Sequence, residues 1–211
     1  VVLSLIFYLN QASHPKVSTL APNANDARRR FSADPSLPEC PQIKIVRIEG
    51  SLFFAAVSNV IETLRNFELK FPVQKNLVIV ASGINSIDME GAEALADETR
   101  HRRGTGGNLY LIGVKEAVSL VLKRTGFIET IGKENIFESK TAALSNIYST
   151  LDQEICKNCS NHIFQECGSI PTSVPRADHI PISALPTTTT LIPSKNKKLK
   201  SNSILHMGPR R

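Results

Sequence analysis

Residues 84–95 read INSIDMEGAEAL and join a short apolar segment to the start of a helix. Asp88 suits the N-cap position, because its carboxylate can accept hydrogen bonds from the free N–H groups of a first helical turn. Glu90 adds negative charge near the positive end of that helix. Small and apolar residues then recur on one side as far as Thr99. This spacing predicts a helix over residues 89–103.

Strands and helices alternate on both sides of this stretch. β-branched or apolar runs predict strands, and apolar residues spaced by three and four predict helices. The predicted elements, in chain order, are a strand at 43–48, a helix around 57–64, a strand at 77–80, the helix at 89–103, a strand at 109–112, a helix at 115–124, a brief edge element at 136–137 and a last helix capped by Ser139. Such alternation predicts an α/β fold with a mainly parallel sheet of about four to five strands flanked by helices.

Segments of different composition flank this domain, which we place at residues 42–154. Residues 11–41 contain many prolines and little periodicity, which predicts a linker. Residues 1–10 are mostly apolar but too few to cross a bilayer alone, so they fit either a hydrophobic strand or the end of a transmembrane helix. Residues 155–168 form a cysteine-rich extension. Residues 169–211 are rich in Pro, Thr and Ser and predict a disordered basic tail.

The positive charge is concentrated at the C-terminal end. The chain has 25 Lys and Arg residues against 19 Asp and Glu residues. The excess equals the basic residues that follow position 190, which are Lys195, Lys197, Lys198, Lys200, Arg210 and Arg211. The body of the protein is therefore neutral, and we expect no nucleic acid partner.

The order and spacing of several stretches resemble the STAS domain family. The loop and helix after a central strand of that family are similar to residues 84–95, and its next strand is similar to residues 107–114. Its last helices and the turn between them are similar to 123–127, 136–137 and 142–144. The resemblance covers about residues 41–151 and implies the STAS fold, which anti-sigma-factor antagonists share.

STAS domains occur as free anti-sigma-factor antagonists and as the C-terminal domain of SulP-type permeases. Residues 50–55, GSLFFA, resemble a stretch of the permease domains, and residues 1–10 are similar to the end of the last transmembrane helix there. The resemblance therefore implies a cytoplasmic regulatory or assembly domain of a secondary active transporter for sulfate or another inorganic anion. Such a protein would lie in the cell (inner) membrane. A free-standing antagonist-like regulator is the alternative.

Four residues of the loop form the candidate regulatory site: Ser86, Asp88, Glu90 and Gly91. In free antagonists, the serine just before the glycine accepts a phosphoryl group, and the resemblance places Glu90 at that position. Glu90 cannot be phosphorylated, but its carboxylate would imitate a phosphorylated side chain, and Ser86 could substitute as the acceptor. The alternative is that Asp88 only caps the helix while Glu90 complements its dipole.

The cysteine-rich extension holds a second candidate site. Cys156, Cys159, His162 and Cys167 have the spacing Cys-x2-Cys-x2-His-x4-Cys. Four such ligands at short spacing could bind zinc or iron. Buried thiols that simply pack, or a redox pair, are the alternatives.

The remaining expectations concern partners and chemistry. The resemblance implies the transmembrane part of the same permease as a partner, together with a homodimer contact and a regulatory protein or nucleotide. The lysine cluster of Lys195, Lys197, Lys198 and Lys200 could contact anionic lipid head groups. No Ser-His-Asp set or carboxylate cluster is visible, so we expect no catalysis. An enzyme or redox domain built on the cysteines is the third alternative.

Overall fold

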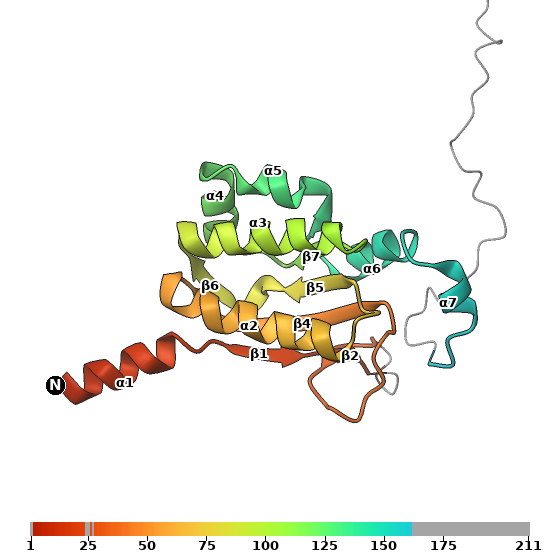
Figure 1. The fold of residues 1–211 in the computed structure, drawn as a ribbon, viewed down its shortest axis with the longest axis horizontal. Coiled ribbons are helices and arrows are strands. Elements are labelled where there is room, and N and C mark those ends of the chain that lie inside the picture. The colour runs from red at the N-terminus through yellow and green to blue at the C-terminus, as the bar shows by residue number, and fades with distance from the viewer. Residues whose placement is uncertain (1, 24–25, 27, 162–211) are drawn as a thin grey trace, which may run out of the picture. The chain divides into compact units, whose positions relative to one another are not determined.

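A six-stranded sheet lies at the centre of the part of the chain that the structure, a computed structural model, describes: residues 2–23, 26 and 28–161 (Figure 1). The strands lie in the order β1, β4, β5, β7, β8, and β6 pairs with the far end of β4. Their bounds are β1 Lys16–Thr19, β4 Ile43–Leu52, β5 Asn76–Val80, β6 Ile84–Ile87, β7 Leu109–Ile112 and β8 Ile136–Phe137. β1 runs antiparallel to β4, and the other pairs are parallel. The predicted α/β fold with a mainly parallel sheet is confirmed.

Both faces of the sheet are covered, and the central strands supply both cores. Leu77 and Ile79 of β5 belong to one hydrophobic core, whereas Val78 and Val80 belong to the other. Successive strand residues point to opposite faces. A strand buried on both faces is therefore a continuous apolar run, as the sequence of β5 is.

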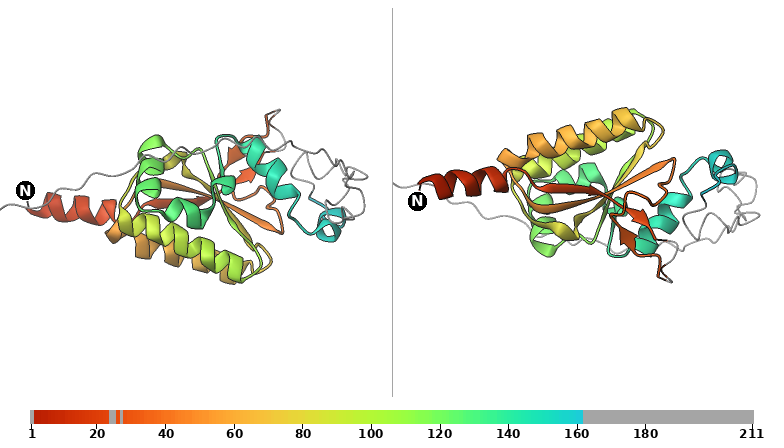
Figure 2. Two further views of the ribbon diagram at one scale, coloured as in Figure 1. Left: turned by 90° about the horizontal axis from the view of Figure 1, so that it is seen from above. Right: turned by 90° about the horizontal axis from the view of Figure 1, so that it is seen from below.

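The helices form a layer on each face of the sheet, as Figure 2 shows. On one face lie α2 Phe54–Lys70, α3 Met89–Gly104, α4 Glu116–Arg124 and α5 Phe127–Ile131. On the other lie α6 Lys140–Tyr148, α7 Gln153–Lys157 and the antiparallel pair β2 Ala21–Pro22 and β3 Phe31–Ser32. Two short 3₁₀ helices, η1 Ala81–Gly83 and η2 Lys133–Asn135, complete the elements.

Residues 11–41, predicted as a linker, contain folded structure. β1 pairs with β4 from Lys16 opposite Glu49 to Thr19 opposite Val46, and Leu20 just after it is buried. A strand of four residues is too short to show a reliable pattern. The sheet includes β1 because it pairs with a partner about thirty positions away. The predicted start of the domain at residue 42 is thus corrected, because the folded unit already includes β1.

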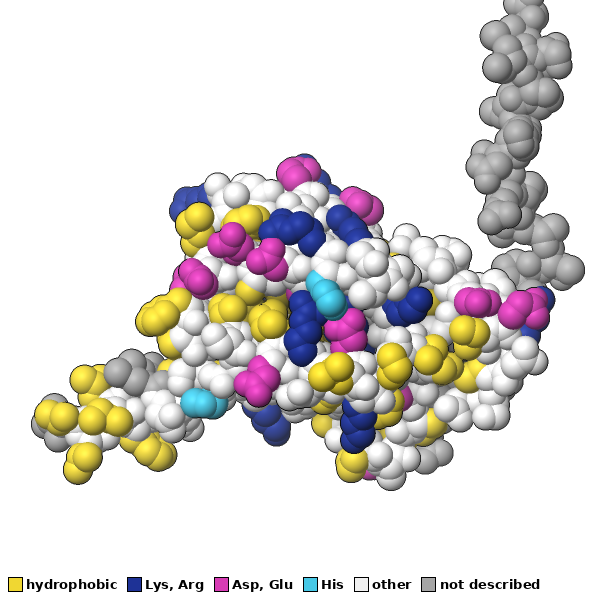
Figure 3. All heavy atoms as spheres, viewed as in Figure 1, with side chains coloured by type: hydrophobic (Ala, Val, Ile, Leu, Met, Phe, Trp, Pro, Cys, Tyr) yellow, Lys and Arg dark blue, Asp and Glu magenta, His cyan; other side chains and the backbone are white. Residues whose placement is uncertain are grey.

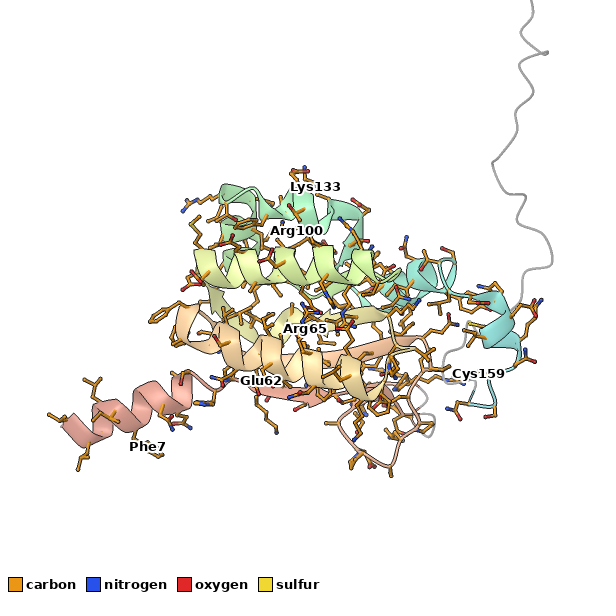
Figure 4. The ribbon with its side chains drawn as sticks, in the orientation of Figure 1. Phe7, Glu62, Arg65, Arg100, Lys133 and Cys159 are labelled. Atoms are coloured by element: carbon orange, nitrogen blue, oxygen red, sulfur yellow. The ribbon has the colours of Figure 1, made fainter. Side chains whose placement is uncertain are left out.

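The apolar N-terminal segment is a helix, α1 Val2–Ala12, and not a strand. Five of its apolar side chains, those of Val2, Leu3, Leu5, Ile6 and Phe7, are exposed, and Phe7, at 70% exposure, points away from the helix in Figure 4. In the described part of the chain, no helix is both long and apolar enough to cross a membrane. An exposed apolar surface of this kind marks a site of contact with a protein or a membrane.

Charged side chains join α2 to α3 around a buried ion pair that lies within α3. Glu98 and Arg102 lie one turn apart on α3 and are 0% and 1% exposed, and Nε of Arg102 donates a hydrogen bond to Oε1 of Glu98 over 2.7 Å. Glu68 of α2 accepts from Nε2 of His101 over 2.9 Å. Burial tends to raise the pKa of Glu68, but the hydrogen bond from His101 and the nearby arginines, Arg102 and Arg65, outweigh it and hold that pKa below its usual value.

Candidate regulatory site

The candidate loop lies where the end of β4, β6 and the first turns of α2 and α3 meet. β4 continues beyond its predicted end and pairs with β6, with Gly50 opposite Ile84 and Leu52 opposite Ile87. The register shifts between these two pairs. Gly50 has a φ of 127°, a conformation that side chains disfavour, so glycine suits this irregular position.

The carboxylate of Asp88 caps two helices at once. Its Oδ1 accepts a hydrogen bond from the N–H of Gly91 over 2.8 Å, as an N-cap of α3 should. Its Oδ2 accepts from the N–H of Phe54 over 2.9 Å, at the start of α2. The N-cap residue of α2, Phe53, makes no side-chain capping bond of its own. The predicted N-cap is confirmed, and the bond to α2 is an addition that no local pattern indicates.

Gly91 is needed because α3 approaches the end of β4 very closely. A Cβ atom built on Gly91 would lie 2.2 Å from the carbonyl oxygen of Leu52 and 2.8 Å from Cγ1 of Ile87. Real Cβ atoms do not approach a carbonyl oxygen to that distance. This glycine therefore has a packing role that is independent of any regulation.

A surface hollow of about 700 Å³ opens beside the loop. Within it, the hydroxyl groups of Ser86 and Ser51 lie 2.9 Å apart in a hydrogen bond. The lining comes from the end of α1, β1, the end of β4 and the loop: Gln11, Ala12, His14, Pro15, Lys16, Glu49, Gly50, Ser51, Phe53, Asn85, Ser86, Ile87 and Asp88. Hydroxyl groups, two amides, basic side chains and carboxylates all line this hollow. They can hold a small polar ligand or a peptide through hydrogen bonds.

The four predicted site residues therefore have three different environments. Ser86 and Asp88 line the hollow, and Gly91 packs beneath it. Glu90 lies on the exposed side of the first turn of α3 and is not part of the lining. Sequence reasoning missed Ser51, although it stands next to Gly50 in a segment that was expected to connect a strand to a helix.

Comparison with known proteins places this geometry in a family. The sequence model that describes the STAS domain family matches residues 34–152, more than half of the chain. The chain belongs to the STAS domain family. The match begins before residue 42, in agreement with the folded structure seen there.

The STAS domain is similar to parts of larger proteins. It is 28% identical over 145 residues to the probable sulfate transporter 4.2 of Arabidopsis thaliana. This match covers 64% of this chain and 21% of that protein. It is 25% identical over 100 residues to the putative sulfate transporter YvdB of Bacillus subtilis (strain 168). This second match covers 47% of this chain and 18% of that protein. The matches thus span about a fifth of the length of these relatives.

Among solved structures, the STAS domain shares its fold with a murine anion transporter. Solute carrier 26 family member A9, in its inward-facing state, matches with a TM-score of 0.59 at 21% identity, and covers 71% of this chain and 25% of that one. Identity this low shows likeness of fold alone. The two curated relatives named above are described as sulfate transporters, and this solved structure as an anion transporter.

The double cap at Asp88 gives a first testable prediction for the STAS domain. Asp88→Ala removes acceptors from two helix starts, so we expect it to lower the free energy of unfolding by about 1–2 kcal/mol. Ser139→Ala is the matched control, because Ser139 caps α6 through one bond, from the N–H of Ala142. Urea unfolding of both variants should give the larger loss for Asp88→Ala. Equal losses would show that the bond to α2 contributes nothing.

Only part of the predicted metal site lies among the described residues. Cys156 is buried beside Gln42, whose Nε2 lies 3.2 Å from its Sγ, and Cys159 is half-buried beyond the end of α7 (Figure 4). Within the described ranges, no three His, Cys, Asp or Glu side chains are arranged to hold a metal ion. His162 and Cys167 lie outside those ranges, as does the lysine cluster of the tail. Zinc or iron binding stays a prediction, which metal analysis of the purified protein tests.

Proposed function

We propose that this chain is the cytoplasmic STAS domain of a membrane transporter for sulfate or a related inorganic anion, and that it acts in assembly or regulation of that transporter. The single observation that carries the proposal is that the STAS family match coincides with similarity to proteins described as sulfate transporters. In this proposal the anion passes through a transmembrane part of the same protein. The STAS domain contributes no group to the anion's path and catalyses no reaction.

One feature of the structure and one of the sequence support the proposal. The first two turns of α1 expose apolar side chains, at residues 2–7, as the end of a membrane helix would. Glu90 stands where the resemblance to free antagonists requires a serine, which disfavours a phosphorylation switch of their kind. A homodimer contact, a regulatory protein or nucleotide at the loop, and a contact of the lysine cluster with lipid head groups remain predictions.

Anion uptake by the complete gene product tests the proposal. We expect cells that lack their own sulfate uptake to accumulate labelled sulfate, or another inorganic anion offered in its place, when they produce the complete protein. Deleting residues 16–157, which run from β1 to α7, should abolish uptake or lower the amount of protein in the membrane, and immunoblotting of membranes separates these two effects. A complete protein that reaches the membrane and moves none of the anions offered would contradict the proposal.

A further inference from the structure

Two cysteines lie three positions apart at the C-terminal end of α7. Cys156 belongs to the helix, and Cys159 follows the C-cap residue, Asn158. The N–H of Cys159 donates a hydrogen bond to the carbonyl oxygen of Cys156 over 3.4 Å, which closes a turn of four residues. Such a turn brings its first and last Cα atoms within about 7 Å of each other. Disulfide bonds join Cα atoms about 4.4–6.8 Å apart, so the turn holds the two residues near the separation that a disulfide needs.

The two thiols differ in their access to solvent. Cys159 is half-buried and lines a surface hollow of about 520 Å³, together with Glu39 and Glu154. Cys156 is 6% exposed and belongs to the hydrophobic core on the same face of the sheet as α6. A dissolved oxidant therefore reaches Cys159 first, and Cys156 is placed to attack the bond formed there. An accessible thiol beside a second, resolving thiol is the usual arrangement of cysteines that respond to oxidants.

The carboxylates beside Cys159 are each paired with a lysine. Oε2 of Glu39 lies 2.9 Å from Nζ of Lys44, and Oε1 of Glu154 lies 2.8 Å from Nζ of Lys157. Figure 3 shows acidic and basic side chains together on the part of the surface that α7 forms. Paired carboxylates repel a thiolate or an anionic oxidant less than unpaired ones. The hollow is therefore open to a small anionic disulfide such as oxidised glutathione.

Gln42, just before β4, joins the sheet both to α7 and to the thiol of Cys156. Its Nε2 lies 3.2 Å from Sγ of Cys156 and donates to the carbonyl oxygen of Asp152 over 3.0 Å. Its Oε1 accepts from the N–H of Asp152, the N-cap of α7, over 2.9 Å. A disulfide requires Sγ of Cys156 to turn from Gln42 toward Cys159. Oxidation therefore removes one of the contacts that hold α7 to the start of the sheet.

We propose that Cys156 and Cys159 form a reversible disulfide that weakens the attachment of α7 to the start of β4. The thiolate of Cys159 attacks one sulfur of oxidised glutathione, forms a mixed disulfide and releases one glutathione thiol. The thiolate of Cys156 then attacks the Cys159 sulfur and releases the second glutathione thiol. The two cysteines lose two electrons and two protons, and the two glutathione thiols gain them. This chemistry does not depend on the proposed function.

Glutathione buffers test for the disulfide in the 211-residue chain. The protein is equilibrated at several ratios of oxidised to reduced glutathione, quenched with an alkylating reagent under denaturing conditions and digested. Mass spectrometry then gives the fraction of each cysteine that is reduced, bound to glutathione or paired. Cys40 is the matched control, because it is also 6% exposed but has no other cysteine near it in sequence. We expect the Cys156–Cys159 pair to be about tenfold or more as abundant as any disulfide of Cys40, since the shorter loop closes more readily.

Serine variants test the order of the two attacks. Cys156→Ser should accumulate glutathione on Cys159, because the resolving thiol is gone, whereas Cys159→Ser should leave Cys156 reduced, because its thiol is buried. Cys167→Ser should leave the pair unchanged. Pairing of Cys156 or Cys159 mainly with Cys40 or Cys167 would overturn the inference. So would a chain that keeps bound zinc or iron and forms no disulfide in these buffers.

Hydrogen exchange measures the effect of the disulfide on α7. Oxidation should speed amide exchange in residues 153–157 by about threefold or more, because a hydrogen bond that holds this helix is lost. Exchange in α6, Lys140–Tyr148, should stay the same. Cys156→Ser in the same oxidising buffer is the control, because it cannot form the bond. Unchanged exchange in α7 of a chain that carries the disulfide would contradict the proposed weakening.

Discussion

Glu98→Ala is expected to lower the free energy of unfolding by about 3–5 kcal/mol, because it leaves the guanidinium of Arg102 buried without its main partner. Arg102 donates from Nε to Oε1 of Glu98 over 2.7 Å and from Nη1 to the carbonyl oxygen of Gln74 over 3.3 Å. The second carboxylate oxygen of Glu98 lies 3.2 Å from Nη2 of Arg65, but outside hydrogen-bond geometry. Urea unfolding of the variant gives the loss directly.

The control for this prediction lies on the same helix. Asp97 pairs with Arg100, but both side chains are exposed, so Asp97→Ala should cost at most about 0.5 kcal/mol. The double variant Glu98→Gln with Arg102→Met should be less destabilised than Glu98→Ala, because it removes the buried charges together. If Glu98→Ala cost no more than Asp97→Ala, the interface between α2 and α3 would not depend on this pair.

Gly91→Ala is expected to cost about 2–3 kcal/mol, through overpacking against rigid backbone. The added Cβ would meet the carbonyl oxygen of Leu52 at 2.2 Å, and neither the end of β4 nor the first turn of α3 can move without disturbing the other. Asp88 lies in the same turn, so relief of the clash would lengthen its bond to Phe54. Thermal unfolding should show the loss as a lower midpoint.

Gly104→Ala is the matched control for Gly91→Ala. Gly104 is the last residue of α3, and a Cβ atom there would meet nothing within 4 Å. Replacing it should leave the stability unchanged or raise it by up to about 1 kcal/mol, because alanine favours the helix. Similar losses for both substitutions would show that the cost at Gly91 is one of backbone conformation and not of close packing.

The sequence predicts the parts of the fold that rest on local patterns. Helix α3 begins at Met89 after the Asp88 cap, and α6 begins after Ser139, whose side chain accepts from Ala142. β5 and β7 are apolar runs, because both of their faces are buried. These features depend on neighbours within a few positions, so they can be read from a single sequence.

Other parts of the fold depend on partners that are distant in sequence. β1 and β6 have four residues each, and each exists because β4 is long enough to pair with both. Helix α6 also ends at Tyr148, and Asp152 caps a separate helix, α7. The cysteines therefore do not continue α6, and Cys156 is held against Gln42 at the start of the domain.

The candidate site also combines features that neighbouring residues indicate with features that depend on residues distant in sequence. The cap at Asp88 follows from its place before an apolar helix, but its second bond, to Phe54, joins residues 34 positions apart. Gly91 is suggested by its place in the loop, whereas its reason, the carbonyl group of Leu52, appears only when β4 and α3 meet.

The size and location of the native protein test the central claim most directly. An antibody raised against residues 42–154 should detect, in the membrane fraction of cells that contain the gene, a protein several times larger than the 23.1 kDa of this chain. That result is predicted because the matching region spans only about a fifth of the length of its transporter relatives. A product of about 23.1 kDa in the soluble fraction would contradict the claim and indicate a free-standing STAS regulator instead.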